Sequence, residues 1–180
     1  MKDAIYFLIS TLLELVVLTF VLRLLLQTVR ADFYNPISQA ILRITNPLVI
    51  PARRAIPSWG RLDLPTLVVI IVLQLAATLT LSGLQGLLYG YPFPGVATLL
   101  YFALLGLMRL LVQFYFFAFL VYALMSWFGP QHQNPLAGVL GRLCNPLLGP
   151  VRRLLPPIGG LDFSVLLVLL ALQAIMIALR

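Results

Sequence analysis

The sequence predicts an all-α membrane protein with four transmembrane helices, built as a tandem repeat of a two-helix unit with short interfacial amphipathic helices in the loops. Composition is the first observation: 62% of the 180 residues are hydrophobic and 9% are charged, whereas a soluble domain is about half apolar and about a quarter charged. The second observation is an internal repeat, and the third is a set of apolar runs of membrane-spanning length.

The repeat has an offset of 99 residues, so that residues 35–74 align without a gap to residues 134–173. Of these 40 aligned pairs 17 are identical, and the identities gather around two arginines, several prolines and an aspartate. Such a period indicates a duplicated structural unit. We therefore divide the chain into a first repeat, residues 1–90, and a second repeat, residues 91–180.

The first repeat is expected to contribute spans at residues 4–29 and 64–88. The first of these rises about 39 Å as a helix, enough to cross a bilayer with some tilt. It is too long for a signal peptide and is interrupted by Glu14 and Arg23, so we predict a retained helix. Arg23 is close enough to the end of its span to snorkel, and we assign it no role. Asp63 is expected to cap the second span.

The second repeat opens with an apolar stretch, residues 96–128, which as one helix would rise about 50 Å and exceed an ordinary span. The 99-residue offset places the third span at residues 103–128. Residues 96–102 are then either an interfacial lead-in or the end of an overlong helix. The fourth span is expected at residues 163–179.

A short amphipathic helix is expected in each repeat, beginning at Asn35-Pro36 and at Asn134-Pro135, because asparagine caps a helix and proline suits its first position. Such a helix lies in the membrane interface. Asn46-Pro47 repeats the start signal, and the prolines that follow limit any further helix to a turn or two. In the first repeat the apolar face would carry Ile37, Ala40, Ile41 and Ile44, opposite Ser38, Gln39 and Arg43.

The arginines give the expected orientation. Positively charged residues favour the cytoplasmic side of a membrane, and two spans per repeat place eight arginines on one side, against Lys2 and Arg180 on the other. The loops that hold them should therefore be cytoplasmic, with both termini outside. The eight are Arg30, Arg43, Arg53, Arg54, Arg61, Arg142, Arg152 and Arg153.

Two arginine pairs with their aspartates form the first candidate site, expected to bind lipid or partner proteins. Adjacent guanidinium groups at membrane level can hold the phosphate of an anionic lipid; the alternative is that they only fix the orientation. With so few polar residues, the net charge of +7 favours anionic lipid and a fixed orientation over nucleic acid. Partner membrane proteins or a homo-oligomer are the other expected partners. The site comprises Arg53, Arg54, Asp63, Arg152, Arg153 and Asp162.

A polar cluster inside the bilayer forms the second candidate site. The offset aligns Glu14 with Gln113 and Gln74 with Gln173, each near mid-depth of its span. Arg109 lies one turn from Gln113, within reach of Glu14 if the first and third spans pack together. Intramembrane ionisable groups are costly and are usually paired or functional. The two interpretations are a buried Glu14–Arg109 pair and an ion or proton path through the bundle.

No enzymatic chemistry is predicted. The sequence has no Walker motif, no Gly-x-Ser-x-Gly and no paired catalytic carboxylates. His132 is the only histidine and Cys144 the only cysteine, so neither a bis-histidine haem site nor a zinc site can be built within one chain. We therefore expect no metal and no cofactor.

The doubled pattern N-P-x-x-x-P-x-R-R-x-x-P-x-x-G-x-x-D, at residues 46–63 and 145–162, resembles the YggT family of small bacterial membrane proteins and their plastid relatives. The resemblance covers nearly the whole chain and implies a bacterial inner (plasma) membrane location. The resemblance links the chain to osmotic or potassium tolerance and to family members whose genes lie beside cell-division genes. Through the plastid relatives it also implies a link to cytochrome b6 haem attachment or nucleoid distribution.

The arginine-rich segments repeat most strongly, so the sequence favours a scaffold or assembly factor that binds anionic lipid and partner membrane proteins. The alternative is a small transporter or channel component linked to ion homeostasis or osmotic tolerance. That function would depend on Glu14, Arg109 and the glutamines rather than on the arginine pairs.

Overall fold

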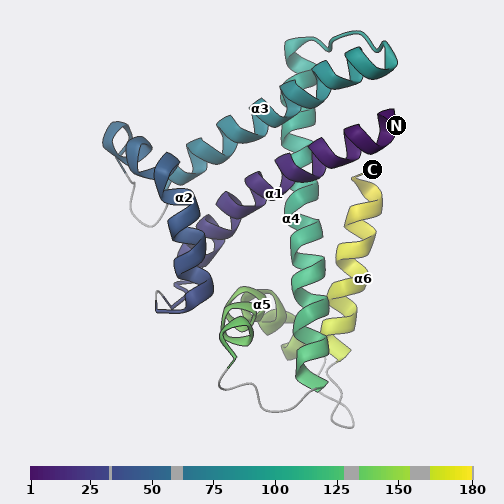
Figure 1. The fold of residues 1–180 in the computed structure, drawn as a ribbon. Coiled ribbons are helices and arrows are strands. Elements are labelled where there is room, and N and C mark those ends of the chain that lie inside the picture. Colours follow the sequence, from purple (N-terminus) through teal and green to yellow (C-terminus); the bar gives the residue numbers. More distant parts are fainter. Residues whose placement is uncertain (33, 58–62, 128–133, 155–162, 180) are drawn as a thin grey trace.

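The computed structural model describes residues 1–32, 34–57, 63–127, 134–154 and 163–179, and every regular element in these ranges is a helix (Figure 1). The all-α prediction is therefore confirmed. In order, the helices are α1 (Lys2–Thr28), α2 (Pro36–Ala55), α3 (Leu64–Tyr89), α4 (Val96–Trp127), α5 (Pro135–Leu154) and α6 (Phe163–Ala178).

Three helices are long and apolar enough to cross a membrane: α1, α3, and α4 over Val96–Met125. The fourth apolar helix, α6, has 16 residues, which at the helical rise is about 24 Å, shorter than a hydrocarbon core of about 30 Å. A fourth crossing by α6 stays a prediction.

The third span is longer than the internal repeat suggests. A continuous helix begins at Val96 and runs for 32 residues, so residues 96–102 are the end of an overlong helix and not a separate lead-in. The preceding helix, α3, stops at Gly90, whose positive φ of 76° gives the left-handed C-cap that only glycine adopts without strain.

The prediction that the second Asn-Pro signal starts a new, short helix is wrong. Helix α2 continues through Pro47 and Pro51, and α5 continues through Pro146 and Pro150. Each proline removes one backbone hydrogen bond. The loss is offset by packing: Thr45 and Val49, on either side of Pro47, are fully buried where α2 meets α1 and α3.

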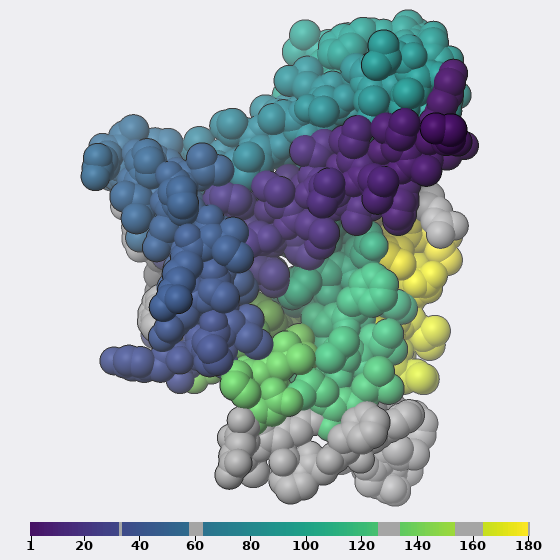
Figure 2. All heavy atoms as spheres, viewed as in Figure 1, coloured from purple at the N-terminus to yellow at the C-terminus, as the bar shows by residue number. Residues whose placement is uncertain are grey.

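Each repeat packs its two long helices side by side and lays its interfacial helix against them. Helix α1 lies beside α3, and α4 lies beside α6 (Figures 1 and 2). Helix α2 contacts α1 and α3, while α5 contacts α4 and α6. The pairs α1–α3 and α4–α6 cross at a large angle (Figure 1).

Each repeat has its own apolar core, and a third cluster joins them. The first core draws on α1, α2, α3 and α4 and includes Phe20, Val49 and Ile70. The second draws on α4, α5 and α6. The joining cluster brings Leu26 and Ile41 of the first repeat against Val139 and Leu143 of the second. Consequently α2 and α5 lie against each other, at the end where α1 and α4 finish.

Candidate functional site

The arginine pairs lie in helices and not in loops. Arg53 and Arg54 occupy the last turn of α2, and Arg152 and Arg153 occupy the last turn of α5. Cations are favoured there by the negative end of the helix dipole. All four residues are exposed, and Arg152 makes a further interaction. Asp162, predicted to belong to this site, lies outside the described residues.

Asp63 organises the first of these pairs. It occupies the N-cap position of α3, is fully buried, and its Oδ2 accepts from Nη2 of Arg53 at 2.6 Å and from Oγ1 of Thr66 at 2.6 Å. Burial alone would raise the pKa of the Asp63 carboxyl, but the hydrogen bonds and charge of Arg53, with those of Thr66, outweigh it and lower the pKa. Asp63 therefore ties the end of α2 to the start of α3.

Arg23 is the residue that sequence reasoning missed. Its side chain does not snorkel: it is 4% exposed, and Nη1 donates to Thr45 Oγ1 at 2.7 Å and to Asn46 Oδ1 at 2.9 Å. Asn46, predicted to start a helix, thus accepts a hydrogen bond from a buried arginine. Arg23 is close to the end of its predicted span, but α2 folds back over the end of α1 and buries it.

A cavity of about 340 Å³, which we call the Arg23 cavity, opens beside this arginine. Ser38 was placed on the polar outer face of its helix, yet it is 4% exposed and lines the cavity. The face of α2 that is buried carries Ser38, Ile41, Thr45 and Val49. The polar lining of the cavity is Arg23, Gln27, Ser38, Asn46 and Arg53, and the apolar lining includes Leu26 and Ile41.

Comparison of the repeats gives the signal that could have identified this site. At the 99-residue offset, Arg23 corresponds to Tyr122, Thr45 to Cys144 and Ser38 to Ala137. Three polar residues of the first repeat are thus replaced together by less polar ones. Cys144 is buried in the apolar core of the second repeat, and Tyr122 packs against it. The coordinated change marks a polar centre that only the first repeat has.

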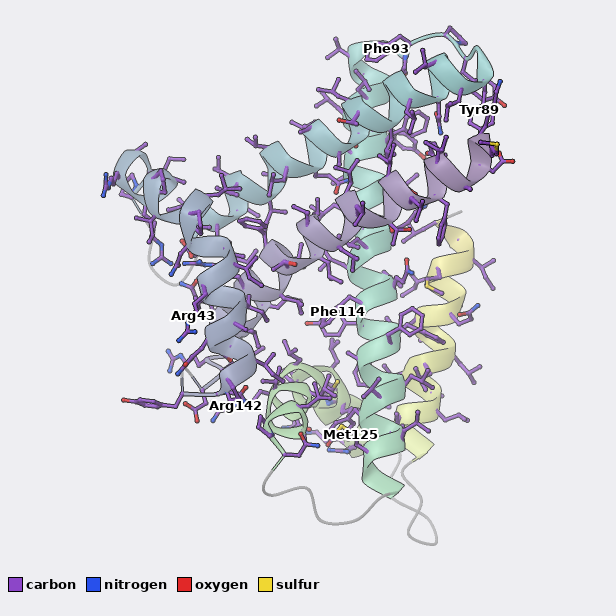
Figure 3. All side chains as sticks on the ribbon, viewed as in Figure 1. Arg43, Tyr89, Phe93, Phe114, Met125 and Arg142 are labelled. Atoms are coloured by element: carbon purple, nitrogen blue, oxygen red, sulfur yellow. The ribbon has the colours of Figure 1, made fainter. Side chains whose placement is uncertain are left out.

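The N-terminal ends of α2 and α5 meet. Asn35 Nδ2 donates to the carbonyl of Pro135 at 2.7 Å, and Arg142 Nη1 donates to the carbonyl of Arg30. Figure 3 shows Arg43 and Arg142 at this end of the molecule, far from Phe93 in the turn between α3 and α4. The starts of α2 and α5 therefore lie together, whereas the two arginine pairs lie at the opposite ends of these helices.

The intramembrane polar residues also gather, but not as the predicted pair. A second cavity of about 370 Å³ lies among α1, α3 and α4 and is lined by Glu14, Gln74, Arg109 and Gln113; Gln173 is not among its lining residues. In the described part of the chain no ion pair joins Glu14 to Arg109. Arg109 Nε donates to the carbonyl of Leu179 instead.

Hydroxyl groups and a close backbone approach complete this central cavity. Thr78 and Ser82 of α3 line it beside Gln85, whose amide donates to the hydroxyl of Tyr6 at 2.9 Å. A Cβ on Gly106 would lie 2.7 Å from Nε2 of Gln74, so glycine at this position of α4 leaves room for the amide. The cavity therefore offers several oxygen atoms in addition to one carboxylate.

Comparison with known proteins gives a consistent family match. The profile of the CCB3/YggT family matches residues 2–84 and 101–180. An uncharacterized protein of Pseudomonas aeruginosa is 40% identical over 176 residues, covering 97% of this chain and 87% of the relative. The uncharacterized protein YggT of Escherichia coli K12 is 40% identical over 169 residues, covering 94% and 85%. No solved structure matches the chain.

Proposed function

The chain belongs to the CCB3/YggT family, and from this premise we propose a non-enzymatic membrane scaffold or assembly factor that binds anionic lipid and partner membrane proteins. The arginine-bearing helices α2 and α5 form its binding surface. We further propose that the protein lies in the bacterial inner membrane, with α2 and α5 in the cytoplasmic leaflet, α6 as a fourth span and both termini outside.

One observation supports this proposal above the others: α2 and α5 combine exposed apolar residues with exposed arginines. Ile44 and Leu48 of α2 are 66% and 50% exposed, beside Arg43 and Arg54. Helix α5 repeats the combination with Leu136 and Leu147. One flank of each helix is thus used for packing and another is free for the membrane interface, where apolar residues enter the acyl region and arginines meet phosphates.

Three exposed arginines suit a test because their side chains make no hydrogen bond or ion pair within the described residues: Arg43, Arg54 and Arg153. Each juxtamembrane cation contributes on the order of 1 kcal/mol to binding of anionic lipid. Changing all three to glutamine should therefore weaken phosphatidylglycerol binding by roughly a hundredfold. The affinity can be measured by titrating the lipid into detergent-solubilised protein and following it by native mass spectrometry.

Lys2→Gln is the matched control, since Lys2 lies at the opposite end and donates to the carbonyl of Leu88. This variant should bind phosphatidylglycerol as the wild type does. If the triple variant keeps wild-type affinity for phosphatidylglycerol, the arginines serve orientation alone and the lipid-binding proposal fails.

The central cavity favours a second candidate function, a path for a monovalent cation through the bundle. Glutamine, threonine and serine oxygens supplement the carboxylate of Glu14 there, and several oxygen atoms are what replaces an ion's hydration shell. On this function, proteoliposomes should release K⁺ faster than protein-free vesicles, and Glu14→Leu should abolish the difference. Equal release from both kinds of vesicle would eliminate the path.

A further inference from the structure

We propose that the Arg23 cavity is a phosphate-binding site of the first repeat, with Arg23, Arg53 and Ser38 as the groups that hold the phosphate. The phosphate is carried by a phospholipid headgroup or by a free phosphate ion. The inference rests on the proposed lipid-binding function where the source is a lipid, and names one specific pocket for it. The exposed arginines would attract anionic lipid in general, whereas this pocket would select one molecule.

Charge is the first reason. Arg23 is 4% exposed and permanently protonated, and both of its hydrogen bonds go to the uncharged oxygens of Thr45 and Asn46. The neighbouring carboxylate, Asp63, is held by Arg53 and Thr66. Two guanidinium groups therefore share one carboxylate. A buried cation without a counter-ion is costly, and an anion in the cavity would supply the missing charge.

Unused donors are the second reason. Nε of Arg23 and Oγ of Ser38 are buried and have no hydrogen-bond partner in the part of the chain that the structure describes, although buried polar atoms are rarely left unpaired. Both residues line the same cavity. A phosphate group has several acceptor oxygens, and arginine binds phosphate with two parallel hydrogen bonds. The donors present are thus those that a phosphate requires.

Size and surroundings are the third reason. The cavity of about 340 Å³ is within the range of small-molecule sites, about 300–1,000 Å³. It holds a phosphate with room to spare for a glycerol group. Its apolar lining from Leu26 and Ile41 lies where the end of α1 meets the interfacial helix α2. A phospholipid entering from the interface would place its headgroup against the arginines and its glycerol against these side chains.

The second repeat provides an internal comparison. Tyr122, Cys144 and Ala137 stand where the first repeat has Arg23, Thr45 and Ser38. They carry neither a permanent charge nor the same donors, and the thiol of Cys144 is fully buried in an apolar core. The protein should therefore hold one phosphate group tightly, and not two, despite its twofold repetition.

The experiment compares wild type, Arg23→Gln, Ser38→Leu and the control Lys2→Gln, which removes an exposed cation from the other end of α1. Native mass spectrometry with phosphatidylglycerol or phosphatidylcholine counts the tightly held lipids, and thermal unfolding with inorganic phosphate forms a second arm. Wild type and Lys2→Gln should each hold one phosphatidylglycerol. Arg23→Gln and Ser38→Leu should bind it at least tenfold more weakly.

Two variants are used because Arg23→Gln removes hydrogen bonds that support the fold. Ser38→Leu fills the cavity and leaves the bonds of Arg23 in place. Unfolding temperatures without ligand identify which variants are folded. If inorganic phosphate raises the unfolding temperature of wild type but not that of Arg23→Gln, free phosphate is sufficient for binding. If only phosphatidylglycerol binds, the phosphate must be that of a lipid headgroup.

The outcomes separate this site from the proposed function. Equal retention of phosphatidylglycerol by wild type and the folded variants, with no phosphate response that depends on Arg23, overturns the site and leaves the surface arginines as the binding groups. Loss of one tight lipid in Arg23→Gln, with wild-type behaviour in the triple surface variant, supports the site and contradicts surface binding.

Discussion

Asp63→Ala is expected to destabilise the protein by about 2–3 kcal/mol, because it removes a buried charged acceptor from Thr66 and from Arg53, whose own side chain is 44% exposed. The carboxylate is fully buried and is bonded to Arg53 and Thr66, and Arg23 lies close enough to feel its charge. Without it, the two arginines that line the Arg23 cavity lose their neighbouring carboxylate. The unfolding temperature in detergent should fall by on the order of 10 °C.

Arg54→Ala is the matched control, because Arg54 is exposed and follows Arg53 in the same helical turn. Its effect should stay within about 0.5 kcal/mol, as for most surface substitutions. If Asp63→Ala and Arg54→Ala unfold at the same temperature, the Asp63 carboxylate does not hold α2 to α3.

The same carboxylate should give an acid limit to stability. Its pKa is lowered in the folded protein, because the bonds to Arg53 and Thr66 outweigh the effect of burial. A group with a depressed folded pKa contributes stability that is present above the unfolded pKa, about 3.9 for aspartate, and that is lost as pH falls through the folded pKa. Wild-type stability should therefore decline below about pH 4, and Asp63→Asn should lack this part of the decline.

Cys144 should react with alkylating reagents roughly a thousandfold more slowly than an ordinary thiol at pH 8, because the thiolate is the reactive form. The side chain is fully buried, and burial raises the pKa of its thiol to about 12. Iodoacetamide labelling followed by intact-protein mass spectrometry measures the rate. Protein unfolded in SDS is the control and should label at the ordinary rate; equal rates before and after unfolding would contradict the packing of α5.

Much of the fold could be predicted from the sequence, because a bilayer imposes a length on each apolar run. The expected spans at residues 4–29 and 64–88 match α1 and α3 to within two residues. The continuation of α2 through Pro47 could not be predicted, because the local rule for proline opposes it. The helix continues through Pro47 because Thr45 and Val49 are buried against other helices.

The candidate sites show the same division. The alignment of the repeats brought out Glu14 and Gln113, and the structure places both at one cavity. Arg23 was assigned no role because its distance from the end of its span allowed snorkelling. Its burial depends on α2 folding back across α1, which no local pattern records, and only its replacement by Tyr122 in the second repeat hints at it.

Cysteine labelling in intact cells tests the central claim most directly, that the arginine-bearing helices α2 and α5 lie in the cytoplasmic leaflet. Single cysteines would replace the exposed residues Gln39 of α2, Phe93 of the α3–α4 turn and Ala178 of α6, with the buried Cys144 left in place. An impermeant maleimide should label positions 93 and 178 in intact cells, and position 39 only after permeabilisation. Labelling of position 39 in intact cells would contradict the orientation. If position 93 is labelled in intact cells and position 178 is not, α6 does not cross the membrane.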